Sequence, residues 1–344
     1  MRLNHLKKIS TKAIVLLLPL AASLLILSAC TPPAEVSAAQ PPPMEQTLSA
    51  APPASLTPTP AATRTPRPTS RIKVIAHRNL QYSKASERTS LDLYLPEGAG
   101  PFPLVIWVHG GSWMSGNKDD CLLVNWGVGR QGYAIASVNY RLSDEAIFPA
   151  QIRDLKAAIR WLRAHAAEYR IDTQHIGLWG ASAGGHLASL AGVSYGEKRF
   201  EEGENLEQST RVNVVIDYYG PTDLIAKVTT PGFEARQKPD SPESKLMGGP
   251  ILERRELAAL ANPLAYATSD DPPHMILHGD KDNVVPLSQS QMLDKALKKA
   301  HVHSQLIIIP GAGHGGEVFY SEQYLAQVAL FLDTFLRPGH QPTK

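Results

Sequence analysis

From about residue 71 the chain alternates short apolar runs with longer helical segments, and this alternation constrains the fold more than any other feature. The apolar runs are LVIWVHG (104–110), YAIASVNYR (133–141), IGLWG (176–180), VNVVIDYYG (212–220), MILHGD (275–280) and SQLIIIP (304–310). Compact runs of this kind are typical of parallel strands that are buried on both faces. Strands that alternate with helices indicate an α/β doubly wound sheet.

The helical segments show the expected periodicity. The clearest is residues 148–169, where Ile152, Leu155, Ile159 and Leu162 share one face; others are 288–300 and 322–336. Upstream, residues 72–82 and 89–96 predict an antiparallel strand pair, and the second strand is expected to alternate between buried and exposed positions. We therefore expect a mostly parallel sheet of about eight strands with helices on both faces.

Residues 221–262 interrupt this alternation. The segment is longer than a simple crossover needs. It is expected to form either a small cap over the carboxyl edge of the sheet, where open α/β folds bind ligands, or a surface excursion without a role. The catalytic domain as a whole is predicted to span residues 71–344.

The N-terminus has the pattern of an export signal. A basic start, MRLNHLKK, leads into a short apolar run, and LSAC at 27–30 resembles the bacterial lipobox. The resemblance implies a signal peptide over 1–29 and a lipidated Cys30 that anchors the protein in a membrane. Ordinary secretion and a retained transmembrane anchor are the alternatives.

A proline-rich segment follows the lipobox. Residues 30–70 have almost no large apolar side chains and predict an extended, disordered linker. The formal charge of the whole chain is +2, and setting aside the four cations of the first twelve residues leaves −2. A nearly neutral body gives no electrostatic reason to expect nucleic acid as a partner.

The stretch IGLWGASAGGHLASLA (176–191) places Ser182 between Gly180 and Gly184. A buried strand turns directly into a helix there, and larger side chains on either side of the serine would collide with the neighbouring strand or helix. Such a turn exposes the hydroxyl at the carboxyl edge of the sheet. The G-x-S-x-G pattern alone occurs by chance in many chains, but this setting indicates that Ser182 is a nucleophile.

A serine needs a base to accept its proton. His314 lies in the glycine-rich loop after the last strand, in IIIPGAGHGG, and such a loop can reach back over the sheet edge. We therefore predict His314 as the general base. His109, His186 and His274 touch or flank strand ends, and we interpret them as hydrogen-bonded structural residues.

The imidazole in turn needs a carboxylate. Asp280 and Asp282 both follow the strand in MILHGDKDNVVP, and loop geometry alone does not separate them. The order Ser, Asp, His along the chain is that of the α/β-hydrolase triad.

The loop HGGSW (109–113) follows another buried strand. Its backbone N–H groups, with Gly111 and Ser112 as the expected donors, would stabilise an oxyanion together with the N–H of Ala183. One such donor contributes about 3 kcal/mol to catalysis.

Residues 72–337 resemble the α/β-hydrolase superfamily and, more narrowly, bacterial esterases of the BD-FAE (feruloyl-esterase-like) and hormone-sensitive-lipase-like type. The resemblance rests on HGGSWMSGNK, SVNYRLS, FPAQIRDLKAAIRWLR, GASAGGHLA, YGPTDL, HGDKDNVVP and GAGHG. It implies Ser182 as nucleophile, His314 as base and Asp282 as the acid of the triad. Asp280 and Asp223 are implied to be structural.

One position departs from the family pattern. Many relatives have glycine where this chain has Ser112. The backbone N–H survives the change, and the side chains of Ser112 and Trp113 are expected to narrow the acyl pocket.

These features predict a serine carboxylesterase that hydrolyses a small-molecule ester, of short-acyl or aryl (feruloyl) type, without a metal or organic cofactor. The same triad would serve an arylformamidase-like amide hydrolase or a short-peptide hydrolase, since the HGGSW loop also resembles that of kynurenine formamidases. A non-catalytic surface binding protein is the remaining alternative. Lipidation of Cys30 would place the protein in the cell envelope.

Overall fold

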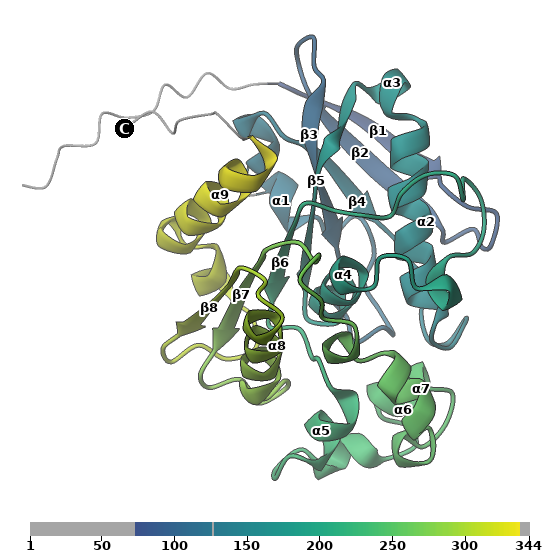
Figure 1. The fold of residues 1–344 in the computed structure, drawn as a ribbon, viewed down its shortest axis with the longest axis vertical. Helices are drawn as coiled ribbons and strands as arrows, with labels where there is room; N and C mark the ends of the chain where they lie inside the picture. Colours follow the sequence, from purple (N-terminus) through teal and green to yellow (C-terminus); the bar gives the residue numbers. More distant parts are fainter. Residues whose placement is uncertain (1–72, 126, 338–344) are drawn as a thin grey trace, which may run out of the picture. The chain divides into compact units, whose positions relative to one another are not determined.

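The computed structural model describes residues 73–125 and 127–337. The predicted signal peptide (1–29), Cys30 and the linker (30–70) lie outside these described residues. The described chain contains an eight-stranded sheet, in the order β1-β2-β4-β3-β5-β6-β7-β8, with helices packed on it (Figure 1). The strands are β1 (Val74–Gln81), β2 (Ser90–Pro96), β3 (Phe102–Val108), β4 (Ala134–Val138), β5 (Ile171–Ala181), β6 (Val214–Tyr218), β7 (His274–Gly279) and β8 (Ser304–Ile309).

Most of the sheet is parallel. β4, β3, β5, β6, β7 and β8 pair in parallel, whereas β2 runs antiparallel to both β1 and β4. All the apolar runs from residue 104 onward form strands, as predicted. The carboxyl ends of the parallel strands therefore meet at one edge, where the loops that follow them come together.

The predicted alternation in β2 is wrong, because all seven of its residues are buried. β2 lies inside the sheet, between β1 and β4. Its polar residue Asp92 is buried with two cations: Lys118 Nζ lies 2.9 Å from Oδ1 and Arg78 Nη1 lies 2.8 Å from Oδ2. Ion pairing, rather than exposure, thus accounts for the charged residue in this strand.

Helices cover both faces of the sheet (Figure 1). Leu104, Ile106 and Val108 of β3 belong to one core cluster with residues of α2 and α4, whereas Val105 and Trp107 belong to a second cluster with residues of α9. The helices are α1 (Leu122–Asn125), α2 (Ala150–Ala164), α3 (Ala166–Tyr169), α4 (Ala183–Val193), α5 (Leu224–Thr229), α6 (Pro242–Leu246), α7 (Arg255–Leu260), α8 (Ser288–Lys299) and α9 (Glu322–Leu336). The predicted helix at 148–169 is divided at His165 into α2 and α3.

The insertion at 221–262 forms the short helices α5, α6 and α7, which lie together in Figure 1. It begins after the carboxyl end of β6 and is tied to neighbouring loops and helices. The N–H of Phe148, in the segment after β4, donates to the carbonyl of Leu246 at 2.8 Å. His186 Nε2, on α4, donates to the carbonyl of Ala261 at 2.7 Å. These contacts hold the insertion at the carboxyl side of the sheet.

None of the helices in the described part of the chain has the length and apolar character needed to cross a membrane.

Candidate active site

Ser182 occupies the sharp turn between β5 and α4. Its backbone has φ 55° and ψ −120°, a sparsely populated combination for a residue with a side chain. Its N–H donates to the carbonyl of Tyr218 at 2.8 Å, at the end of the neighbouring strand β6. The turn therefore holds the half-buried hydroxyl at the carboxyl edge of the sheet.

Gly180 and Gly184, the two glycines of the G-x-S-x-G motif, allow this turn because they have no side chain. A β-carbon on Gly180 would lie 2.1 Å from the carbonyl oxygen of Gly184. A β-carbon on Gly184 would lie 2.0 Å from the carbonyl oxygen of Val108 in β3. Both distances are far below van der Waals contact with a backbone atom, so the predicted steric reason for the glycines is what the structure shows.

The structure brings Ser182, His314 and Asp282 together in one line. His314 Nε2 lies 2.9 Å from Ser182 Oγ, and His314 Nδ1 lies 2.7 Å from Asp282 Oδ2. The side chain of His314 is 17% exposed and that of Asp282 is 0% exposed, so the line runs from the surface into the protein. A hydroxyl, an imidazole and a buried carboxylate in this order can pass a proton from the serine to the imidazole.

Hydrogen bonds join the loops after β7 and β8, and they distinguish the role of Asp280 from that of Asp282. The N–H of Gly311 donates to Asp280 Oδ1 at 2.6 Å, and the N–H of Lys281 donates to the carbonyl of Ala312 at 2.9 Å. Asp280 thus joins the two loops, while Asp282 faces the imidazole. Sequence reasoning without the family resemblance left this choice open.

Asp282 is held in its ionised form. Burial alone would raise the pKa of its carboxyl group, but hydrogen bonds from His278 and His314 and from the backbone N–H of Val285 lower this pKa well below its usual range. A carboxylate that stays ionised can fix the tautomer of His314 and stabilise its charged form.

The HGGSW loop lies directly beside the serine turn. A β-carbon on Gly110 would be 3.3 Å from the β-carbon of Ser182. Gly111 has φ 108° and Ser112 has φ 55°, so both residues adopt left-handed conformations. Within residues 73–125 and 127–337, the backbone N–H groups of Gly111, Ser112 and Ala183 have no acceptor. These are the N–H groups that the sequence predicts as oxyanion donors.

The side chains of Tyr219 and His278 also contact the site, and sequence reasoning missed both. The ring of Tyr219, just after β6, meets that of His314 edge to face with 4.7 Å between ring centres. His278 Nε2 lies 3.2 Å from Asp282 Oδ2. The tyrosine in VNVVIDYYG and the histidine in MILHGD follow or end buried strands, and that position at the sheet edge was the available signal.

The three other histidines considered in the sequence make structural contacts. His109 Nδ1 donates to the Gly110 carbonyl, His186 Nε2 to the Ala261 carbonyl and His274 Nδ1 to the Pro272 carbonyl, each at 2.7 Å. Burial lowers the pKa of each of these imidazoles to about 4. All three are therefore neutral near pH 7.

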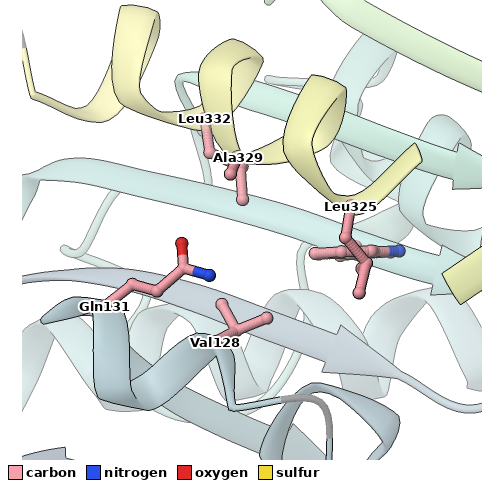
Figure 2. A pocket seen from close by; sticks show the side chains of 6 residues that line it. Val128, Gln131, Leu325, Ala329 and Leu332 are labelled. Carbon is pink, nitrogen blue, oxygen red and sulfur yellow. The ribbon is translucent and has the colours of Figure 1, made fainter. Parts of the chain in front are cut away.

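No group of three or more His, Cys, Asp or Glu side chains in the described residues is arranged to hold a metal ion. A small pocket lies elsewhere, between α9 and the turn at 128–131, and Figure 2 shows its labelled side chains. It contains none of the predicted site residues. Its lining is Val128, Gln131, Trp179, Leu325, Ala329 and Leu332.

Comparison with known families identifies the chain. Residues 91–297, more than half of the sequence, match the family model described as BD-FAE. The chain belongs to the BD-FAE family. Among curated relatives of this BD-FAE protein, "Esterase LipC" of Mycobacterium tuberculosis is 32% identical over 71% of this chain and 61% of its own length. "Probable carboxylic ester hydrolase LipM" of the same organism is 30% identical, over 72% of this chain and 56% of its own length.

The BD-FAE chain thus spans about six tenths of the length of these two curated relatives. The matches to similar solved structures extend over nearly the whole length of those chains. A "truncated form of carbohydrate esterase from gut microbiota" has a TM-score of 0.70 and 33% identity, over 78% of this chain and 98% of its own. The esterase Est2 of Thermogutta terrifontis has a TM-score of 0.62 and 25% identity, over 79% of this chain and 96% of its own. The predicted α/β-hydrolase fold is confirmed.

Proposed function

We propose that this BD-FAE protein is a serine carboxylesterase that works through an acyl-enzyme intermediate. One observation carries the proposal: the unbroken line from Ser182 Oγ through His314 to Asp282, with contacts of 2.9 and 2.7 Å. The esterase names of the relatives and of the similar structures support the reaction class.

In the acylation step, Ser182 Oγ attacks the ester carbonyl carbon while its proton passes to His314 Nε2. His314 Nδ1–H donates to Asp282, which stabilises the charged imidazole. The carbonyl oxygen, which becomes negatively charged, accepts hydrogen bonds from the N–H groups of Gly111, Ser112 and Ala183. The tetrahedral intermediate then collapses, and the alcohol leaves with the proton from Nε2.

In the deacylation step, water replaces the alcohol. His314 Nε2 accepts a proton from the water as the water oxygen attacks the acyl carbon. The oxyanion of the second tetrahedral intermediate accepts hydrogen bonds from the same N–H groups. Its collapse returns the proton to Ser182 and releases the carboxylic acid. The sum is one ester and one water converted to one acid and one alcohol.

For the substrate, we propose an ester with a short acyl group or an aryl acyl group of the feruloyl type. The insertion at 221–262 is proposed to form a wall of the pocket, because it begins directly after β6 and is tied to α4 through His186. The name of the 33% identical carbohydrate esterase adds a sugar as a candidate alcohol component.

Turnover of p-nitrophenyl acetate, methyl ferulate, an acetylated xylo-oligosaccharide and N-formylkynurenine tests this proposal. We expect the esters to be hydrolysed and Ser182→Ala to reduce their turnover by about 10⁴-fold or more. A preference for N-formylkynurenine would favour the amide-hydrolase alternative. Equal turnover by Ser182→Ala and the wild type would contradict the serine mechanism, and no turnover of any compound would favour a binding protein.

We also propose that the protein is exported and anchored through lipid on Cys30. The basic start, the apolar run and the LSAC sequence support this proposal. Labelled palmitate should enter the wild-type protein during bacterial expression but not Cys30→Ser, which should leave the membrane fraction. Cys121→Ser, which changes a buried cysteine, is the matched control. Labelling of Cys30→Ser at the wild-type level would contradict the anchor.

A further inference from the structure

The carboxylate of Asp282 contacts a second imidazole besides that of His314. His278 Nε2 lies 3.2 Å from Asp282 Oδ2, the oxygen that also accepts from His314 Nδ1 at 2.7 Å. The side chains of His278 and Asp282 are both 0% exposed. His278 comes from β7, whereas His314 comes from the loop after β8. Asp282, the carboxylate of the proposed triad, therefore has a buried imidazole, that of His278, as a further neighbour.

The partners of His278 assign the position of its proton. Nε2 faces two acceptors, the carbonyl of Val285 at 2.9 Å and Asp282 Oδ2 at 3.2 Å. Because neither oxygen can donate, Nε2 must carry the hydrogen. Nδ1 lies 2.7 Å from the buried hydroxyl of Ser290, on α8, which can donate to it. A neutral ring protonated at Nε2 accepts from Ser290 at Nδ1 and donates its one hydrogen to the Val285 carbonyl, sharing it with Asp282 Oδ2 at the longer distance.

Asp282 is fully occupied by its own partners. Its Oδ1 accepts from the N–H groups of Val284 and Val285 at 2.8 and 2.9 Å. Its Oδ2 faces the two imidazoles. A carboxylate offers about four lone-pair directions, so none is left unused. Rotation of the carboxylate away from His314 would break at least one of these bonds inside the protein, where an unmet polar group is costly.

We propose that His278 is a positioning residue for the reaction proposed above. Its Nε2–H, oriented by Ser290 and shared between the Val285 carbonyl and Asp282 Oδ2, holds this carboxylate oxygen toward His314 Nδ1. His278 acts through Asp282 and not on the substrate. This inference rests on the proposed serine mechanism, and it extends the line of three side chains to Ser182–His314–Asp282–His278–Ser290.

Two substitutions at the same position separate the hydrogen bond from the space that the ring fills. His278→Gln can place an amide N–H near the position of Nε2, whereas the shorter side chain of His278→Asn reaches only the position of Nδ1. We expect His278→Gln to keep kcat for p-nitrophenyl acetate within about threefold of the wild type. His278→Asn should lower kcat by about 10- to 100-fold with little change in KM, as expected for losing a hydrogen bond to a charged group.

His274→Asn is the matched control. His274 is also a fully buried imidazole of β7, but it bonds the backbone carbonyl of Pro272. It should lose thermal stability to a similar degree and keep kcat within about twofold of the wild type. All kcat values are compared at a temperature where circular dichroism shows each variant folded. Equal losses of kcat in both His278 variants, or wild-type kcat in His278→Asn, would overturn the inference.

A measurement without substrate distinguishes this inference from the proposed function. Imidazole ¹H–¹⁵N NMR of the full-length protein should show His278 as the neutral tautomer protonated at Nε2 near pH 7. A ring protonated at Nδ1 would overturn the positioning role while leaving the esterase proposal intact. Absence of ester turnover by the wild-type protein would instead remove the proposed function, and the positioning role with it.

Discussion

Gly184 lies against the carbonyl oxygen of Val108, so closely that a β-carbon on the glycine would be 2.0 Å from that oxygen. Val108 ends β3 and leads into the HGGSW loop, whereas Gly184 stands in the first turn of α4, just after Ser182. This contact therefore sets the distance between the loop and the serine turn, which together carry the proposed oxyanion donors.

Gly184→Ala should separate these two segments. The added methyl group meets backbone atoms that cannot rotate away, so we expect the free energy of unfolding to fall by about 1–3 kcal/mol or more and esterase activity to fall sharply. Gly313→Ala is the control, because its β-carbon would meet nothing closer than 4.0 Å. Urea unfolding measures both variants. Wild-type stability of Gly184→Ala would show that the contact is not tight.

Lys118→Met should destabilise the start of the sheet. The Lys118 side chain is 8% exposed, and its ammonium group lies 2.9 Å from Oδ1 of Asp92, whose side chain is 0% exposed. Loss of one partner of a buried pair typically costs about 3–5 kcal/mol, and the remaining Arg78 contact should reduce this loss. Asp119→Asn, at a residue that is 65% exposed and 3.7 Å from the same ammonium group, should change stability by less than about 0.5 kcal/mol. Equal free energies of unfolding for these two variants would show that the buried pair of Lys118 and Asp92 does not stabilise the fold.

Asp217→Asn should alter how stability depends on pH. Burial raises the pKa of Asp217 to about 6, although Ser189 and the N–H of Gly220 donate to it. Because this value lies above that of an unfolded aspartate, the charged form is disfavoured in the folded state, and wild-type stability is lost as pH rises from about 4 to 6. Asparagine cannot ionise and avoids this loss.

The free energy of unfolding of Asp217→Asn, relative to the wild type, should therefore increase by about 2–3 kcal/mol between about pH 4 and pH 7. Urea titrations at several pH values measure this difference. A difference that is independent of pH would show that Asp217 does not titrate in this range.

Ser112→Gly should retain activity on acetate esters and accept longer acyl chains better. The substitution keeps the backbone N–H and suits a residue at φ 55°, while it removes a side chain beside the serine turn. We expect the ratio of kcat/KM for p-nitrophenyl octanoate over acetate to rise roughly 3- to 10-fold. Ser115→Gly, at an exposed position of the same loop, should leave the ratio unchanged. An unchanged ratio in Ser112→Gly would mean that this side chain does not narrow the pocket.

The strands, the main helices and the placement of Ser182 and His314 at one sheet edge could be predicted from the sequence. Local periodicity specifies buried strands, and parallel strands bring their carboxyl ends together whatever their order. The two glycines around Ser182 carry a steric requirement that can be recognised in the sequence itself.

Contacts between distant segments could not be predicted in the same way. The burial of Asp92 depends on Lys118, which reaches it from another segment. The separation of Asp280 from Asp282 depends on the N–H of Gly311, which belongs to the next loop. The contact of His278 with Asp282 forms only when the turn after β7 folds back, so its position at the end of a strand did not identify its partner.

Trapping the acyl-enzyme tests the proposed role of Ser182 without relying on a comparison of rates. The wild-type protein is mixed with p-nitrophenyl acetate, quenched in acid within the first turnover and digested, and the peptides are analysed by mass spectrometry. We expect one acetyl group on the peptide that contains Ser182, at Ser182 itself, and none in Ser182→Ala. Release of p-nitrophenol at the wild-type rate by Ser182→Ala, or acetylation at a different residue on the path to product, would contradict this role of Ser182.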